Sequence, residues 1–332
     1  MSDSVPSLEI AAQNLKVCYE QTLALDIQRL QVGGRIVAVI GHNGSGKSTF
    51  LKSVLGLLQP RSGVLTTRWK RDELVIDLRA ERDMAFSPEN GAVFADVSVE
   101  SYIKLWCRIK QGSGDYYRKQ GRHYLEQLDI FPLLGKLGRE LSKGQRRRVQ
   151  TAIGFLTQPK LFLFDEPFDG LDIAQSNQLS SVILEQSQRM SMIISSHRME
   201  VVERLADLVI VLQAGKVVTC GTVDEVCAAL CGRSFTIADL GEVVAHLLPI
   251  LRTEFATCLI NSIGSQVSIT GIDVDEEAVT QFFGRHHINS PALRPTRPSL
   301  VDAMQYHLKK MPAPTMVSAT RPSVAHRRTD FT

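Results

Sequence analysis

The chain has 332 residues, of which 44% are hydrophobic and 22% are charged, so its composition is that of a globular protein and not of a disordered or fibrous one. Its net charge of +3 is too small to indicate nucleic-acid binding, and its apolar runs fall far short of the roughly 20 residues that a membrane-spanning helix needs. The polar start, Met1–Glu9, does not resemble a signal peptide, and the six scattered cysteines contain no CxxC pair, which favours reduced thiols in a cytosolic protein.

The first predicted elements lie in Leu8–Leu30, where apolar and polar residues alternate in two pieces. This pattern predicts two antiparallel strands with Tyr19 in the turn between them. An exposed aromatic ring just before a phosphate-binding loop can stack on a nucleotide base, because stacking needs only a flat π surface. An aromatic residue at a strand end can equally serve packing, and position alone does not decide between the two.

Residues 41–48, GHNGSGKS, fit the phosphate-binding pattern G-x-x-x-x-G-K-[ST]. The apolar run Arg35–Ile40 predicts a buried strand before the loop, and Thr49–Leu55 predicts a helix after it. Such a turn aims backbone N–H groups and the positive end of a helix dipole at one point. We expect Lys47 to bridge the β- and γ-phosphates and the Ser48 hydroxyl to ligate Mg²⁺. The nucleotide-binding residues predicted in this stretch are Gly41, His42, Asn43, Gly44, Ser45, Gly46, Lys47, Ser48 and Thr49.

Further strands are predicted at residues 63–65, 74–76 and 84–89, and the last of them runs into a polar loop at residues 89–96. From about residue 97 to 138 the apolar spacing becomes helical. Between Lys104 and Arg148, basic residues outnumber acidic ones by 12 to 4. This excess fits either a solvated helical face or a docking surface for anionic lipid or a partner loop.

The segment Leu141–Gln145, LSKGQ, leads into a predicted helix that begins with the run Arg146–Arg148. A Ser-x-Gly turn that opens a helix is a second candidate anion site, by the same dipole argument. Three consecutive residues point in different directions around a helix, so the arginines do not form a stripe of the kind that binds nucleic acid.

The apolar run Leu161–Phe164 ends in two acidic residues, Asp165 and Glu166. A buried parallel strand places such carboxylates at the edge of the sheet where ligands bind. We expect Asp165 to support Mg²⁺, through water or the Ser48 hydroxyl, and Glu166 to polarise the water that attacks the γ-phosphate. A later apolar strand ends on His197; a histidine there is often structural, but its expected closeness to the acidic pair favours a γ-phosphate contact.

The composition changes near residue 230. Strands are predicted at 234–237, 257–260 and 266–269, with helices near 240–251 and 276–283, which together predict a small α+β domain. Residues 312–332 contain three prolines and few apolar residues, a composition that predicts a disordered tail.

Taken in order, these motifs resemble those of the ATP-binding cassette (ABC) family of transporter ATPases. Residues 41–49 resemble its Walker A motif, 141–145 its signature motif, 161–167 its Walker B motif, 170–172 its D-loop and 195–197 its switch-histidine motif. Tyr19 falls where the family has an adenine-stacking aromatic residue. The resemblance implies an α/β P-loop NTPase cassette at 8–228, with a parallel-sheet core, an antiparallel β subdomain and a helical subdomain at about 97–155. We expect an accessory α+β domain at 232–310 and a disordered tail at 311–332 to follow.

The resemblance also implies a function. It predicts an ATP-binding and ATP-hydrolysing subunit at the cytoplasmic face of the membrane, which drives a separate transmembrane permease chain and has no nucleic-acid partner. Two cassettes would pair head to tail around two ATP molecules, each held by one chain's Walker A and the other chain's Ser142 and Gly144. The implied roles are catalytic for Glu166, His197 and Lys47, metal-binding for Ser48, Asp165 and Glu89, and nucleotide-binding for Ser142, Gly144, Gln145 and Asp172.

Two positions depart from the family pattern. Lys143 replaces a glycine of the signature, and Glu89 stands where the family has a glutamine that helps to arrange Mg²⁺ and water and senses the membrane partner. Residues 86–89 and 298–304 resemble ATPase subunits of ABC-2 exporters, which favours export. The alternatives are a non-transport ABC ATPase that acts on ribosomes or nucleic acid, and a regulatory module that binds ATP without turnover.

Overall fold

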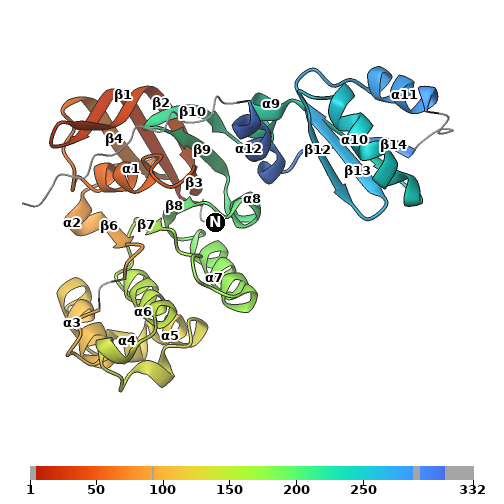
Figure 1. Ribbon diagram of the computed structural model, residues 1–332. Coiled ribbons are helices and arrows are strands. Elements are labelled where there is room, and N and C mark those ends of the chain that lie inside the picture. Colours follow the sequence, from red (N-terminus) through yellow and green to blue (C-terminus); the bar gives the residue numbers. More distant parts are fainter. Residues whose placement is uncertain (1–4, 92, 287–291, 311–332) are drawn as a thin grey trace, which may run out of the picture.

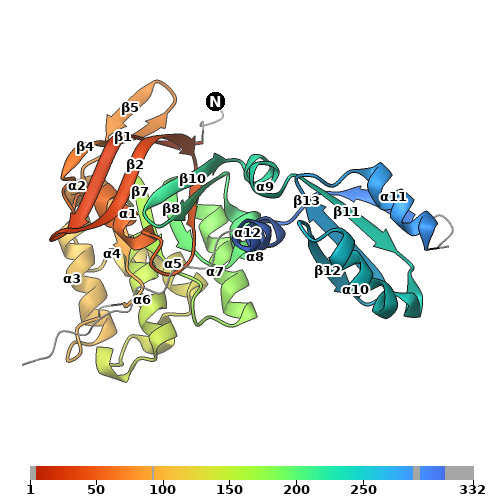
Figure 2. The ribbon, with the colours of Figure 1, turned by 45° about the horizontal axis from the view of Figure 1, so that its top comes forward.

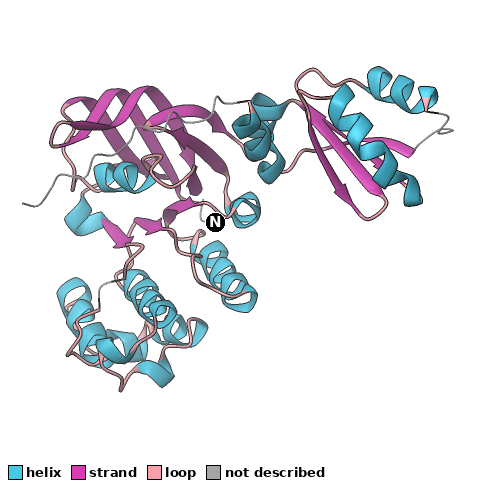
Figure 3. Cartoon of the chain, viewed as in Figure 1, coloured by secondary structure: helices cyan, strands magenta, loops and turns pink. Residues whose placement is uncertain are grey.

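The computed structural model describes residues 5–91, 93–286 and 292–310. Within them the strands form three sheets, two in the N-terminal two thirds of the chain and one in a separate C-terminal unit (Figure 1). The cartoon in Figure 3 shows strands gathered at the top of the larger unit and helices below them. The ABC cassette fold predicted from the sequence is confirmed by this arrangement of a parallel and an antiparallel sheet.

The central sheet has six strands in the order β10-β9-β3-β8-β7-β6, and all neighbouring pairs except β10 with β9 are parallel. Every residue of β3, β7 and β8 is buried, as expected for apolar strands covered on both faces. Because β3, β8 and β7 are parallel neighbours, their carboxyl ends share one edge of the sheet. The strands are β3 (Ile36–Ile40), β6 (Met84–Ser87), β7 (Leu161–Asp165), β8 (Ser191–Ser196), β9 (Leu208–Gln213) and β10 (Lys216–Gly221).

The second sheet is antiparallel, in the order β2-β1-β4-β5. Its long hairpin buries alternate residues such as Leu8 and Ile10 in one apolar cluster with β3 and α1, because only one face of this sheet meets the core. Its strands are β1 (Ser7–Tyr19), β2 (Thr22–Gly34), β4 (Ser62–Arg71) and β5 (Leu74–Asp77). The predicted pair of strands in residues 8–30 is confirmed, with Tyr19 as the last residue of β1.

Helices α3 to α6 gather below the central sheet (Figure 1). Their core is aromatic: Tyr124 stacks on Phe155, which meets Phe162 and Phe164 of β7. The helices of the cassette are α1 (Lys47–Val54), α2 (Ala80–Asp83), α3 (Val99–Gln111), α4 (Tyr116–Lys119), α5 (Arg122–Gln127), α6 (Lys143–Leu156), α7 (Ile173–Gln186), α8 (Met199–Leu205) and α9 (Val223–Cys231), with short 3-10 turns at Phe131–Leu133 and Gly138–Glu140.

The C-terminal unit lies to one side of the cassette in both Figure 1 and Figure 2. It has its own antiparallel sheet, in the order β12-β13-β11-β14, and its own core, which includes Phe282 and Phe283. Its elements are β11 (Arg233–Ala238), a 3-10 turn at Gly241–Val243, α10 (Val244–Glu254), β12 (Leu259–Ile263), β13 (Gln266–Gly271), α11 (Glu276–Arg285) and β14 (Ala292–Thr296).

The last helix, α12 (Leu300–Lys309), differs from the sequence expectation. The sequence predicts residues 300–310 as part of the accessory domain, and α12 does hydrogen-bond to that unit through Asp302 and Lys309. However, it lies beside α9 and shares a core cluster with Val209 and Val211 of β9. Leu300 and Ala303 are fully buried there, so apolar burial draws this helix back to the cassette. The predicted disordered tail, 311–332, lies outside the described residues.

None of the helices that the structure describes combines the length and apolar character needed to cross a bilayer.

Candidate active site

The glycine-rich loop, residues 41–46, connects the end of β3 to the start of α1. Gly46 has φ 107°, a left-handed conformation that a side chain would strain, and a Cβ there would lie 2.8 Å from Leu25 Cδ2. The loop therefore needs glycine for both its backbone angle and its packing. It delivers Lys47 and Ser48 at the N-terminus of α1, where unpaired backbone N–H groups favour anions.

Lys47 is 6% exposed, and its ammonium group is held by three oxygens. Its Nζ donates to the carbonyl oxygens of Gly41 at 2.8 Å and of His42 at 3.3 Å, and lies 3.2 Å from Glu166 Oε1. The cation is thus fixed at the base of the loop and joined directly to the acidic end of β7.

Three side chains connect α1, β7 and β8 beneath the loop. Ser48 Oγ donates to Asp165 Oδ1 at 3.1 Å, and Ser195 Oγ donates to the same oxygen at 2.6 Å. Ser195 Oγ also accepts from the Glu166 amide at 2.9 Å. Sequence reasoning did not give Ser195 a role; its one signal was its place two residues before His197 on an apolar strand.

Glu166 adopts a left-handed backbone conformation with φ 49°, which is uncommon for a residue with a long side chain. Its Oε2 accepts from the His197 amide at 3.2 Å and lies 2.9 Å from His197 Nδ1. The carboxylate is buried, whereas the histidine side chain is 49% exposed. Glu166 therefore stands between the buried Lys47 and the exposed His197.

These groups line a cleft of about 760 Å³, within the usual range for ligand sites. The cleft brings together groups from the glycine-rich loop, the β1–β2 turn and the loops after β6, β7 and β8. Of the residues predicted from the sequence, it is lined by Tyr19, Asn43, Gly44, Gly46, Lys47, Ser48, Thr49, Glu89, Glu166 and His197. Asp169, which the sequence reading did not single out, lines it as well, and Lys143 Nζ, 3.0 Å from Asp169 Oδ2, holds the pKa of that carboxyl below its ordinary value.

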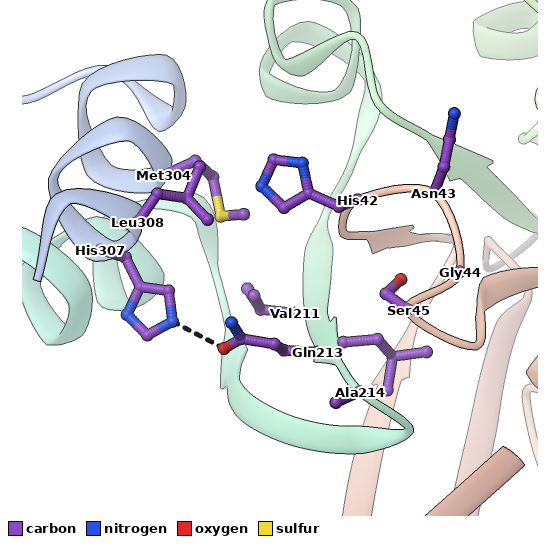
Figure 4. A pocket seen from close by; sticks show the side chains of 11 residues that line it. His42, Asn43, Gly44, Ser45, Val211, Gln213, Ala214, Met304, His307 and Leu308 are labelled. Carbon is purple, nitrogen blue, oxygen red and sulfur yellow. Dashed lines mark hydrogen bonds between the residues drawn. The ribbon is translucent and has the colours of Figure 1, made fainter. Parts of the chain in front are cut away.

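The other side of the glycine-rich loop faces a smaller cavity of about 250 Å³, shown in Figure 4. His42 and Ser45 line this cavity but not the larger cleft, opposite Met304 and His307 of α12. His307 Nε2 lies 3.0 Å from Gln213 Oε1, and burial lowers the pKa of His307. The glycine-rich loop therefore lines the large cleft on one side and, on the other, a small cavity that α12 also lines.

The four predicted nucleotide-binding residues of the signature and D-loop segments do not line the large cleft. Ser142 caps α6: its Oγ accepts from the Gln145 amide, and Gln145 Oε1 accepts from the Ser142 amide. Asp172 caps α7 by accepting from the Gln175 amide at 2.8 Å. Gly144 lies in the first turn of α6. These residues therefore lie at the starts of α6 and α7 and not in the cleft that contains Lys47 and Glu166.

Comparisons with known proteins give a consistent result. Residues 25–169 match the family model described as ABC transporter. The chain is 31% identical over 268 residues to the molybdenum import ATP-binding protein ModC of Aromatoleum aromaticum, which covers 75% of this chain and 67% of that protein. It is 28% identical over 284 residues to the uncharacterized ABC transporter ATP-binding protein YhaQ of Bacillus subtilis, covering 84% and 90%. Among solved structures, an ATP binding subunit of an ABC transporter aligns with TM-score 0.57 and 26% identity over 66% of this chain and 91% of that chain.

Proposed function

This chain belongs to the family of ABC transporter ATP-binding proteins, and on that premise we propose that it hydrolyses ATP as a head-to-tail dimer that drives a separate membrane-spanning chain in export. The observation that carries the proposal is the position of the Glu166 carboxylate, held between Lys47 and His197 at the cleft. A buried carboxylate beside a phosphate-binding lysine has the chemistry of a general base for water that attacks a phosphoryl group.

Each side chain has a distinct proposed part. Lys47, released from Glu166, would contact the β- and γ-phosphates and stabilise the charge that develops during transfer. Glu166 would accept a proton from the attacking water, and His197 would hold the γ-phosphate from the exposed side of the cleft. Tyr19 is 44% exposed and lines the same cleft, which leaves its ring available to stack on the adenine.

We also propose that Mg²⁺ binds with the nucleotide. Ser48 and Asp165 present oxygen ligands 3.1 Å apart, and Glu89 lines the same cleft as Ser48; such hard oxygen donors suit Mg²⁺. Within the described residues, no group of three or more His, Cys, Asp and Glu side chains could hold a metal alone. Phosphate oxygens would therefore complete the shell, as is usual for this ion, which supplies charge neutralisation on the phosphates.

The dimer is proposed from the signature residues. Ser142, Gly144, Gln145 and Asp172 sit at helix starts that favour anions, but they lie outside the cleft of their own chain. A second copy in head-to-tail orientation would bring them to the phosphates held by Lys47. In this arrangement the glycine-rich loop of one chain and the start of α6 of the other would contact the same ATP.

For the membrane chain, an open apolar groove supports the proposal. Its walls include Leu57, Phe86 and Trp106, and β6 leads directly from this groove to Glu89 in the cleft. Leu57 is 65% exposed, so the groove offers apolar surface to an amphipathic segment of the membrane chain. Export is proposed from the resemblance of residues 86–89 and 298–304 to ABC-2 exporters.

The first test is affinity purification of tagged protein from detergent-solubilised membranes, combined with an ATPase assay. We expect a polytopic membrane protein in near-equal amount, and its loss in Leu57→Arg with ATPase activity retained. Leu74→Arg, at a similarly exposed position on β5, is the matched control. Recovery of ribosomes or nucleic acid in place of a membrane protein would contradict the proposal.

The second test is Glu166→Gln, which keeps the shape of the side chain but removes the base. We expect hydrolysis to fall by about 10²- to 10⁴-fold and an ATP-bound dimer to accumulate in size-exclusion chromatography. Hydrolysis at the wild-type rate would show that Glu166 is not the base.

A further inference from the structure

Arg147, the middle residue of the arginine run on α6, is 3% exposed and bridges two loops. Its Nη2 donates to the Glu89 carbonyl oxygen at 2.9 Å, and its Nη1 donates to the carbonyl oxygen of Asp169. Glu89 follows β6 and Asp169 follows β7, and both line the nucleotide cleft. One planar guanidinium therefore ties the start of α6 to two separate walls of the site.

The charge around this side chain is unusual for a helix interior. Burial lowers the pKa of the Arg147 guanidinium, whereas the carboxylates of four acidic residues act in the opposite direction: Asp169, Glu89, Glu166 and Asp165. A buried cation is costly to maintain unless it is paired and hydrogen-bonded. Arg147 meets this condition through its hydrogen bonds to two carbonyl oxygens and through the favourable charge of these carboxylates.

The cationic residues near Arg147 on α6 make different contacts from those of Arg147. Arg148 ion-pairs with Asp129 at 3.0 Å, away from the cleft. Lys143, one turn before Arg147, ion-pairs with Asp169. Two cations on one face of α6 thus hold the Asp169 loop, and one of them also holds the Glu89 loop.

We propose that Arg147 is a positioning residue that fixes the Glu89 and Asp169 loops relative to each other and to α6, and so sets the geometry of the catalytic cleft. This inference rests on the proposed function. Arg147 does not line the cleft, and its donors point to main-chain oxygens, so it acts through the two loops and not on the nucleotide. Ser142 and Gly144 lie at the start of the same helix. A contact between these residues and a partner chain that shifts α6 would therefore also shift the two loops through Arg147.

The experiment compares Arg147→Lys with the control Arg148→Gln in the full chain. Lys retains the positive charge among the four carboxylates but lacks the fork that reaches two carbonyl oxygens. For Arg147→Lys we expect kcat to fall by about 10-fold or more, because small misplacements of catalytic groups have large effects on rate. The Kd for ATP should stay within about twofold, since the contacts of Lys47 and the glycine-rich loop are untouched.

Each outcome decides the matter. A fall in kcat for Arg147→Lys with an unchanged Kd, beside a normal Arg148→Gln, supports the positioning role. A kcat within twofold of Arg148→Gln overturns it. A parallel loss of kcat, ATP affinity and melting temperature also overturns it, because it indicates a structural role alone. If the wild-type protein itself does not hydrolyse ATP, the proposed function fails first, and this inference fails with it.

Discussion

The two sets of residues that the sequence assigns to ATP differ sharply in their surroundings. Around Lys47, Asp165 and Glu166, side chains from α1, β7 and β8 are buried and bonded to one another. Around Ser142 and Asp172, the polar groups are satisfied locally by helix caps and do not line the cleft. The first set is preorganised within one chain. The second is a pair of capped helix starts outside the cleft, which fits the proposal that another chain brings them to the nucleotide.

The largest expected effect separates these two sets. A Cβ at Gly144 would come no closer than 3.9 Å to any neighbour, and an acidic residue suits the first turn of a helix. We therefore expect Gly144→Asp to fold normally and to bind ATP as a monomer with unchanged affinity. Its carboxylate would oppose the phosphate of the partner chain, and hydrolysis should fall by about 10²-fold or more.

Isothermal titration and a phosphate-release assay measure these two quantities separately. Gly135→Asp, in a loop with open space around it, is the control and should behave as the wild type. Weakened monomer binding in Gly144→Asp would mean that the two sets of residues act on the same nucleotide within one chain.

Mixing two inactive chains sharpens the comparison. Lys47→Ala removes the phosphate-binding cation but leaves the signature intact, and Gly144→Asp does the reverse. In an equal mixture, half of the dimers contain both chains, and each of these has one intact composite site, so roughly a quarter of the wild-type rate should return. The rate of the mixture is compared with that of each variant alone. A mixture as inactive as its components would exclude the head-to-tail arrangement.

The buried set should also contribute to folding, which Ser195→Ala tests. Its hydroxyl donates to Asp165 and accepts from the Glu166 amide, so its loss removes two buried hydrogen bonds. Asp165 keeps its bond from Ser48, and the Glu166 amide keeps the Ser195 carbonyl oxygen. We expect the free energy of unfolding to fall by about 1–3 kcal/mol in urea titrations without nucleotide. Ser191→Ala is the matched control, because Ser191 is fully buried on the same strand and its Oγ bonds to no residue in the described chain. Equal losses in both variants would refute the bridging role.

The same contrast explains how far the sequence could be interpreted. Glycine spacing and apolar strands predict Lys47 and Glu166 because the chemistry is encoded in short, continuous stretches. The bridge through Ser195 and the grip of Arg147 on two loops depend on which strands lie side by side, and no local pattern carries that information. The sequence analysis predicts no strand at β14, which contains Pro295; the proline is tolerated because β14 is an edge strand. The return of α12 to the cassette was likewise invisible, because an amphipathic helix does not specify which apolar surface it covers.

The smallest expected effect comes from the exposed set. Lys143→Gln removes the ion pair with Asp169, in which the side chains are 58% and 37% exposed. Such pairs contribute less than about 1 kcal/mol, and the helix dipole disfavours a cation at this position. Lys143 keeps the folded-state pKa of Asp169 below its ordinary value, so the stabilisation is present above the unfolded pKa and is lost as pH falls through the folded one. Unfolding curves of the two proteins should therefore converge below about pH 4. A difference that persists in acid would show that Lys143 stabilises the monomer by packing and not by its charge.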